Sequence, residues 1–136
     1  MNGFYTKPRV DKDLLEKYHE GIIALSGCLA GEVARALEQN DYDEAKRVAQ
    51  WYSETFGEGN YYLEIQNHGL DEQLRINPEL IRLSKELDIP LVATNDAHYL
   101  KREDAYNHEV LLCIQTGRRM SDEDRMKFNT EELYVK

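Results

Sequence analysis

The fold is decided by the stretch Ile89-Pro90-Leu91-Val92-Ala93-Thr94-Asn95-Asp96-Ala97-His98-Tyr99. Its apolar run, 91–93, has a proline at its entrance, which predicts a strand buried on both faces. Side chains alternate along an extended backbone, so we expect Asp96 and His98 to project to the same side. A carboxylate and an imidazole at the end of a strand can form half of a metal site. The alternative is a polar loop in which His98 is hydrogen-bonded to a neighbouring carboxylate.

Two further strands are predicted upstream of this stretch. Residues 22–25 are apolar and predict a buried strand that leads into Ser26-Gly27-Cys28. Residues 61–66 are rich in aromatic side chains, alternate in polarity, and lead into Asn67-His68-Gly69. Five helices are expected. A short helix capped by Asp11 precedes the first strand, and two follow it, one over 31–39 and one that starts at Asp41 with a capping box to Glu44. The next has Asn77 as N-cap and Pro78 at its first position, and the last covers 103–115 and is ended by Gly117.

Alternation of strand and helix predicts an α/β fold with parallel strands and right-handed crossovers. In such folds the chemistry lies beyond the carboxyl ends of the strands. Those ends would bring Cys28, His68, Asp96 and His98 to one edge of the sheet. Each residue type also has a structural explanation, since a thiol is often buried and a histidine can stabilise a turn. Three strands cannot close a barrel, so the exposed edges indicate a fragment or a chain that relies on a partner.

Composition limits the classes of function. The chain has 136 residues and a net charge of −9. Binding to the phosphates of DNA or RNA requires a basic surface, so this acidic chain is a poor candidate for binding nucleic acid directly. Two cysteines do not form a disulfide framework, and Cys113 is expected in the core. No apolar run approaches bilayer length, so we expect no membrane partner and a cytoplasmic location. The sequence contains no nucleophilic triad or phosphate-binding loop, which leaves metal-assisted hydrolysis as the expected chemistry.

Five motifs carry a family resemblance. They are Lys7-Pro8-Arg9-Val10-Asp11, the block 21–32 (GIIALSGCLAGE), the block 62–69 (YLEIQNHG), the block 91–99 (LVATNDAHY) and the block 108–117 (HEVLLCIQTG). They are spread along the chain, so the resemblance extends over nearly its whole length. They resemble the alpha subunits of bacterial DNA polymerase III, in the later part of their PHP (polymerase and histidinol phosphatase) domain.

This resemblance implies a fragment of a distorted seven-stranded (β/α) barrel with up to three divalent metal ions, such as zinc, manganese or magnesium, at the carboxyl ends of its strands. The implied metal ligands within this sequence are Cys28, Asp96 and His98, and His68 is a second-tier candidate near the site. The opening His-x-His motif of the family would belong to strands before Met1. We therefore expect residues 1–117 to be the C-terminal half of a PHP domain and residues 118–136 to begin the connection to the polymerase core.

The parent implied by the resemblance is a DNA-directed DNA polymerase for DNA replication, with a possible metal-dependent 3′–5′ exonuclease. Its partners would be the remaining PHP strands, the polymerase core, other replicase subunits, and DNA through the parent. We expect the fragment alone to be inactive, because too few ligands remain, and its open strand edges could allow self-association. Two alternatives stay open, a stand-alone phosphoesterase of the histidinol-phosphatase type and a structural module with a vestigial site.

Overall fold

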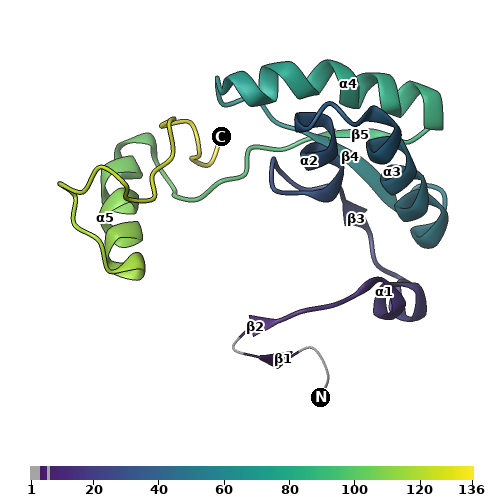
Figure 1. Ribbon diagram of the computed structural model, residues 1–136, viewed down its shortest axis with the longest axis horizontal. Helices are drawn as coiled ribbons and strands as arrows, with labels where there is room; N and C mark the ends of the chain where they lie inside the picture. The colour runs from purple at the N-terminus through teal and green to yellow at the C-terminus, as the bar shows by residue number, and fades with distance from the viewer. Residues whose placement is uncertain (1–3, 6) are drawn as a thin grey trace.

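The computed structural model describes residues 4–5 and 7–136. Figure 1 shows a small sheet covered by helices, with the last helix and the C-terminal tail set to one side. The elements, in chain order, are β1 (Phe4–Tyr5), β2 (Lys7–Pro8), α1 (Lys12–Tyr18), β3 (Ala24–Leu25), α2 (Glu32–Glu38), α3 (Tyr42–Phe56), β4 (Tyr61–Ile65), α4 (Asp71–Leu87), β5 (Leu91–Ala93), a 3-10 turn (Arg102–Asp104) and α5 (Ala105–Thr116).

The main sheet has three parallel strands in the order β3-β4-β5. Ala24 pairs with Tyr61 at one side of β4, and Leu63 pairs with Leu91 at the other. Helices α2 and α3 connect β3 to β4, and α4 connects β4 to β5. The prediction of an α/β fold with three parallel strands alternating with helices is therefore confirmed, and the sheet is open rather than closed into a barrel.

The predicted burial of two strands is wrong. Only β4 is central, and its Leu63 is fully buried. In the predicted strand 22–25, only Ala24 and Leu25 form β3, and Ile23 is 64% exposed. The strand at 91–93 forms as expected, but its side chains are half-buried or exposed rather than covered on both faces. Both strands lie at an edge of the sheet, where only one neighbour is available to cover them.

The core lies where α2, α3 and α4 pack against one another and against β4 (Figure 1). Helix α3 contributes Ala45, Val48 and Ala49, which recur at the spacing of one helix face. The Asp41 carboxylate caps this helix by accepting the amide of Glu44 at 3.0 Å, as predicted. The returning half of the capping box is not made, because the Glu44 carboxylate pairs with Arg47 instead.

Helix α4 starts earlier than predicted. It spans Asp71–Leu87 with Pro78 inside it, so the prediction of Asn77 as N-cap is wrong. Proline has no N–H to donate to the preceding turn, and this is the signal that suggested a helix start. Burial decides otherwise, since Gln73 and Ile76 lie in the core before the proline just as Leu80 does after it. The Asn77 side chain donates to the carbonyl of Gln66 at 2.9 Å rather than capping a helix.

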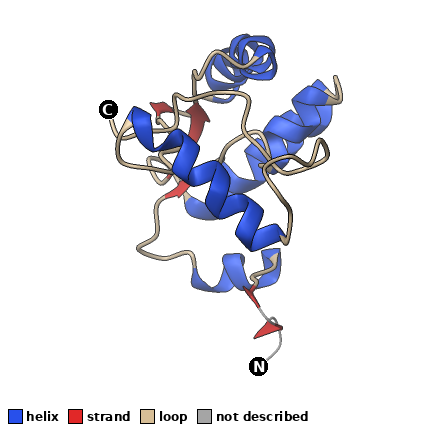
Figure 2. Cartoon of the chain, turned by 90° about the vertical axis from the view of Figure 1, so that its left-hand side faces the viewer, coloured by secondary structure: helices blue, strands red, loops and turns tan. Residues whose placement is uncertain are grey.

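Helix α5 lies away from the three-helix cluster, beside the C-terminal tail (Figure 1). Figure 2 views the chain from that side, with helices, strands and loops in separate colours. It ends at Gly117, whose positive φ of 67° confirms the predicted helix stop. Cys113 is buried, as expected, whereas Leu111 and Ile114 on the same helix are exposed. Over the described residues, no helix combines the length and the apolar character needed to cross a membrane.

Candidate functional site

The carboxyl ends of the three parallel strands share a small polar network. Thr94, directly after β5, donates its hydroxyl to the Glu64 carboxylate on β4. The Gln66 amide donates to the same carboxylate at 3.0 Å and to the Thr94 hydroxyl at 3.1 Å. Ser26, directly after β3, accepts the backbone N–H of Glu64 at 2.8 Å. Parallel pairing thus ties all three strand exits together, which places the segments that follow them at one edge of the sheet.

Asp96 and His98 meet at the end of β5. The distance between Asp96 Oδ1 and His98 Nε2 is 3.5 Å, and the two side chains are 35% and 29% exposed. The backbone route differs from the prediction, because Asp96 has a φ of +42° and is not extended. Aspartate tolerates the left-handed region better than most residues with a Cβ atom. The expected proximity of the pair is therefore confirmed, but a left-handed kink produces it rather than simple alternation.

Cys28 lies in a different environment. It is half-buried after β3 and lines a small cavity together with Ser26 and Glu64. Within residues 4–5 and 7–136, no three His, Cys, Asp or Glu side chains come together in a group that could hold a metal ion. Cys28 therefore does not join Asp96 and His98 as a third donor in this arrangement.

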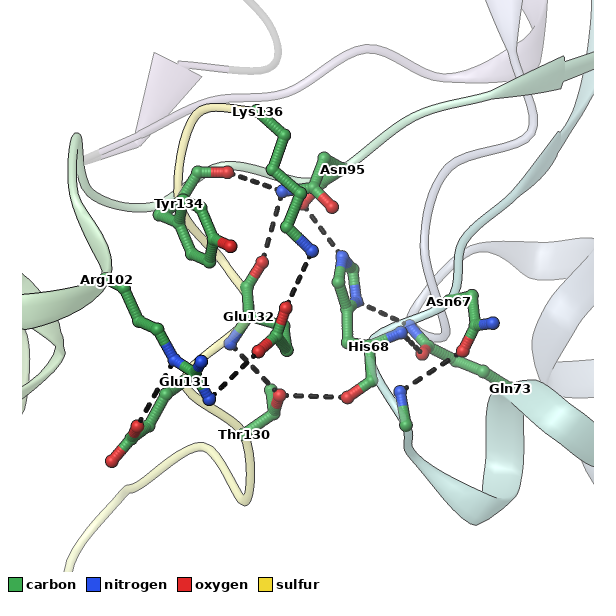
Figure 3. Close-up of polar contacts among 11 residues, drawn as sticks. Asn67, His68, Gln73, Asn95, Arg102, Thr130, Glu131, Glu132, Tyr134 and Lys136 are labelled. Atoms are coloured by element: carbon green, nitrogen blue, oxygen red, sulfur yellow. Dashed lines mark hydrogen bonds and ion pairs between the residues drawn. The ribbon is translucent and has the colours of Figure 1, made fainter.

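His68 is buried, with 4% of its surface exposed, and both of its ring nitrogens have partners (Figure 3). Nδ1 lies 2.8 Å from the Gln73 amide nitrogen, and Nε2 lies 2.8 Å from the backbone carbonyl oxygen of Asn95. The His68 carbonyl accepts a hydrogen bond from the Thr130 hydroxyl at 2.9 Å. In this arrangement, no ring nitrogen of His68 is available to bind a metal.

The C-terminal tail closes over the Asn95–His98 segment (Figure 3). The Asn95 side-chain amide donates to the carbonyls of Glu132, at 3.1 Å, and Tyr134. Between these two residues, the Leu133 carbonyl accepts the backbone N–H of His98 at 2.8 Å. The Leu133 side chain is itself buried. Tyr134 also forms a single parallel bridge with Tyr99.

An aromatic cluster surrounds His98 on its other side. The Phe128 ring lies 4.9 Å and the His108 ring 5.4 Å from the His98 ring, measured between centroids. His108 and Phe128 also stack at 5.6 Å and line a cleft of about 560 Å³ between α5 and the tail. Burial lowers the pKa of His108, and the nearby His98 lowers it further. His108 therefore packs within this cluster, and its surroundings favour the neutral form of its ring.

The donor set supplies two of the groups that a divalent ion needs. A carboxylate oxygen and an imidazole nitrogen are suitable first-row metal ligands, and Asp96 and His98 present them within reach of each other. A protein metal site usually takes three or four such ligands. The described residues thus fit half a site, and further ligands would have to come from elsewhere.

Sequence reasoning missed two residues of this region. Gln73 is buried inside α4, and Thr130 lies in the tail, 62 positions after its partner. Glutamine in a helix and threonine in a polar tail carry no local signal of such a role. Both side chains bond to His68, which the sequence did single out, so His68 is the one local indication of this group.

Comparisons with known proteins agree with this geometry. A model of the PHP domain family matches residues 1–68. The chain is 52% identical over 134 residues to the DNA polymerase III subunit alpha of Deinococcus radiodurans, a match that covers 98% of this chain and 10% of the relative. It is 45% identical over 136 residues to the same subunit of Borreliella burgdorferi, a match that covers all of this chain and 12% of the relative. It is 42% identical over 136 residues to the subunit of Thermus aquaticus, which covers all of this chain and 11% of that relative.

This chain thus spans about a tenth of the length of the curated relatives that it matches. The resemblance drawn from the motifs is confirmed across nearly the whole chain, and the open parallel sheet agrees with part of a PHP barrel. The chain belongs to the PHP domain family and is similar along its length to part of DNA polymerase III subunit alpha.

Proposed function

We propose that this chain serves DNA replication as part of the PHP domain of a replicative DNA polymerase subunit. The similarity to DNA polymerase III subunit alpha supports this, since it extends over 98–100% of the chain in three relatives. The DNA-directed polymerase activity would belong to other parts of such a protein. With a net charge of −9, this region would contact the polymerase core and other replicase subunits in the cytoplasm rather than grip DNA.

We further propose that Asp96 and His98, with Cys28 as a third candidate, contribute to a site for zinc, manganese or magnesium. The observation that carries this is the 3.5 Å approach of Asp96 Oδ1 to His98 Nε2 at the end of a parallel strand. A divalent ion bound there would polarise a phosphodiester and activate water, the chemistry of 3′–5′ proofreading. The chain's own part is to hold the two ligands, and the remaining ligands would come from PHP strands outside this region. The chain alone would not hydrolyse DNA.

A second function, structural support without a metal, is favoured by the packing of His98. Its ring lies against Phe128 and His108, and its Nε2 lies 3.5 Å from the Asp96 carboxylate. In this case the pair would hold the β5 exit against the tail, and metal affinity would play no part.

A thermal melt with and without Mn²⁺ or Zn²⁺ separates the two functions. A metal at a hundred times its dissociation constant should stabilise the chain by about 2.7 kcal/mol. We expect this shift in the wild type and its loss in the double variant Asp96→Asn/His98→Ala. Asp88→Asn/His19→Ala is the matched control, because Asp88 also has a positive φ but lies outside the site.

Two further results decide between the candidates. Loss of the shift in Cys28→Ser would support Cys28 as the third ligand. A wild type whose melting temperature does not respond to either metal, at any concentration tested, contradicts a metal half-site in this chain and supports the structural function.

A further inference from the structure

His68 is a buried histidine that the proposed metal site does not use as a ligand. Polar groups buried in a protein almost always have hydrogen-bond partners. His68 makes four hydrogen bonds: two through its ring nitrogens, one through its backbone N–H and one through its carbonyl. Its contacts lead to Asn95, which directly precedes Asp96 (Figure 3). The question is what this arrangement holds in place.

The hydrogen bonds assign the ring tautomer. Gln73 Oε1 accepts the backbone N–H of His68 at 2.7 Å, so the Gln73 amide nitrogen is the atom that faces the ring. That nitrogen can only donate, and His68 Nδ1 therefore accepts. The ring proton is left on Nε2, which donates to the carbonyl oxygen of Asn95 at 2.8 Å. Gln73 thus orients His68 twice, through its oxygen and through its nitrogen.

The Asn95 carbonyl belongs to the same peptide plane as the backbone nitrogen of Asp96. Fixing this carbonyl fixes the orientation of the peptide that enters Asp96, the residue with a φ of +42°. A left-handed conformation at a residue with a Cβ atom persists only when the surroundings over-determine it. Here the ring of His68 holds the carbonyl, and the Asn95 side chain is held by the tail on the opposite side.

We infer that His68 is a positioning residue, which holds the Asn95–Asp96 peptide so that the Asp96 carboxylate faces His98. The inference rests on the proposed function, because it assigns His68 a task for the Asp96–His98 pair. It gives His68 a different role from the second-tier ligand of the sequence analysis, since His68 would act on the site through the backbone. Partners that orient metal ligands affect affinity strongly although they never touch the ion.

Two substitutions at this position separate positioning from stability. His68→Phe keeps a flat ring but removes both ring hydrogen bonds. His68→Gln keeps an acceptor for Gln73 and a donor for the Asn95 carbonyl, and should rescue the arrangement. Leu80→Ala is the control for stability, because it removes from the core helix α4 a side chain that is 2% exposed and cannot make a hydrogen bond to this network.

The first readout needs no metal. NMR couplings and Cα shifts of Asp96 in the metal-free 136-residue chain report whether its φ is left-handed. We expect His68→Phe to shift Asp96 toward extended values, while His68→Gln and Leu80→Ala keep the wild-type values, the latter despite a lower melting temperature. Left-handed values for Asp96 in a folded His68→Phe chain would overturn the inference.

The second readout is Mn²⁺ binding, followed by the loss of the free-ion EPR signal. We expect His68→Phe to weaken binding by about tenfold or more and Leu80→Ala to leave it unchanged. If the wild type does not bind Mn²⁺, the proposed metal function fails while the NMR result still decides the positioning. If the wild type binds and His68→Phe binds equally well, the positioning inference fails while the metal function stands.

Discussion

The clamp made by Asn95 offers a direct test of how the tail is attached. Its side-chain amide donates to the carbonyls of Glu132 and Tyr134, on either side of Leu133. The Leu133 carbonyl in turn accepts the backbone N–H groups of His98 at 2.8 Å and Tyr99 at 3.2 Å. Asn95→Ala removes both side-chain hydrogen bonds and leaves the two backbone bonds in place. The tail should then open more often while the core stays folded.

The size of the effect follows from these contacts. A neutral hydrogen bond contributes about 1 kcal/mol net, so the loss of two should weaken the attachment by about 2 kcal/mol. A change of this size shifts an opening equilibrium by a factor of about 30. Amide hydrogen exchange measures local openings of this kind. We therefore expect the amides of His98 and Tyr99 to exchange about 30-fold faster in Asn95→Ala.

The control is Asn67→Ala, in the loop after β4. Asn67 makes a local hydrogen bond to the amide of Gly69 at 3.2 Å and does not bond to the tail. It should leave the exchange of His98 and Tyr99 unchanged. Equal protection of these two amides in wild type and Asn95→Ala would refute the clamp. A uniform loss of protection that also includes core amides such as that of Leu63 would mean that the whole fold, and not the tail, depends on Asn95.

Two other substitutions test how the strand exits and the core are built. Gly31→Ala would place a Cβ atom 2.3 Å from the carbonyl oxygen of Ser26, so the loop that carries Cys28 must shift. We expect the free energy of unfolding, measured by denaturant melt, to fall by about 1–3 kcal/mol. An unchanged denaturation midpoint would contradict this close approach. Tyr61 is buried, its hydroxyl has no partner among the described residues, and burial raises its pKa above the usual 10.0. Tyr61→Phe should stabilise the chain by about 1 kcal/mol at neutral pH. Tyr61→Phe should also lose less stability than the wild type above pH 10, because Tyr61 ionises at lower pH in the unfolded chain than in the folded one. The control is Tyr18→Phe, since Tyr18 is exposed. If stability falls equally with pH above 10 in both variants, the raised pKa of Tyr61 is contradicted.

The elements that the sequence predicted well are those specified by local chemistry. Asp11 and Asp41 cap their helices as expected, because an N-cap carboxylate acts only on amides three residues away. Gly117 ends α5 because it adopts a positive φ that disfavours other residues. Proline was the misleading local signal, since the buried face of α4 outweighed the hydrogen bond that Pro78 cannot make.

The site was predictable only in part. Asp96 and His98 are two residues apart, so their proximity was predictable, but the left-handed φ of Asp96 that turns the two side chains toward each other carries no local sequence signal. The involvement of Cys28 depends on contacts beyond its strand, and the described residues do not bring it to the pair. The metal ligation of all three residues stays a prediction, as do the division at residue 117 and the self-association of the open sheet.

By itself, the sequence determined the α/β class, the parallel direction of the strands, the helix caps at Asp11 and Asp41, and the family. The class, the strand direction and the caps follow from periodicity and short-range hydrogen bonds between neighbouring residues, and the family follows from the resemblance of the five motifs. Only the tertiary structure decided which strand is central, that His68 turns inward to hold Asn95, and that the tail returns to clamp the β5 exit. These contacts join residues 27 to 62 positions apart. No local pattern encodes such pairs, because their geometry exists only after the helices have packed and the chain has closed on itself.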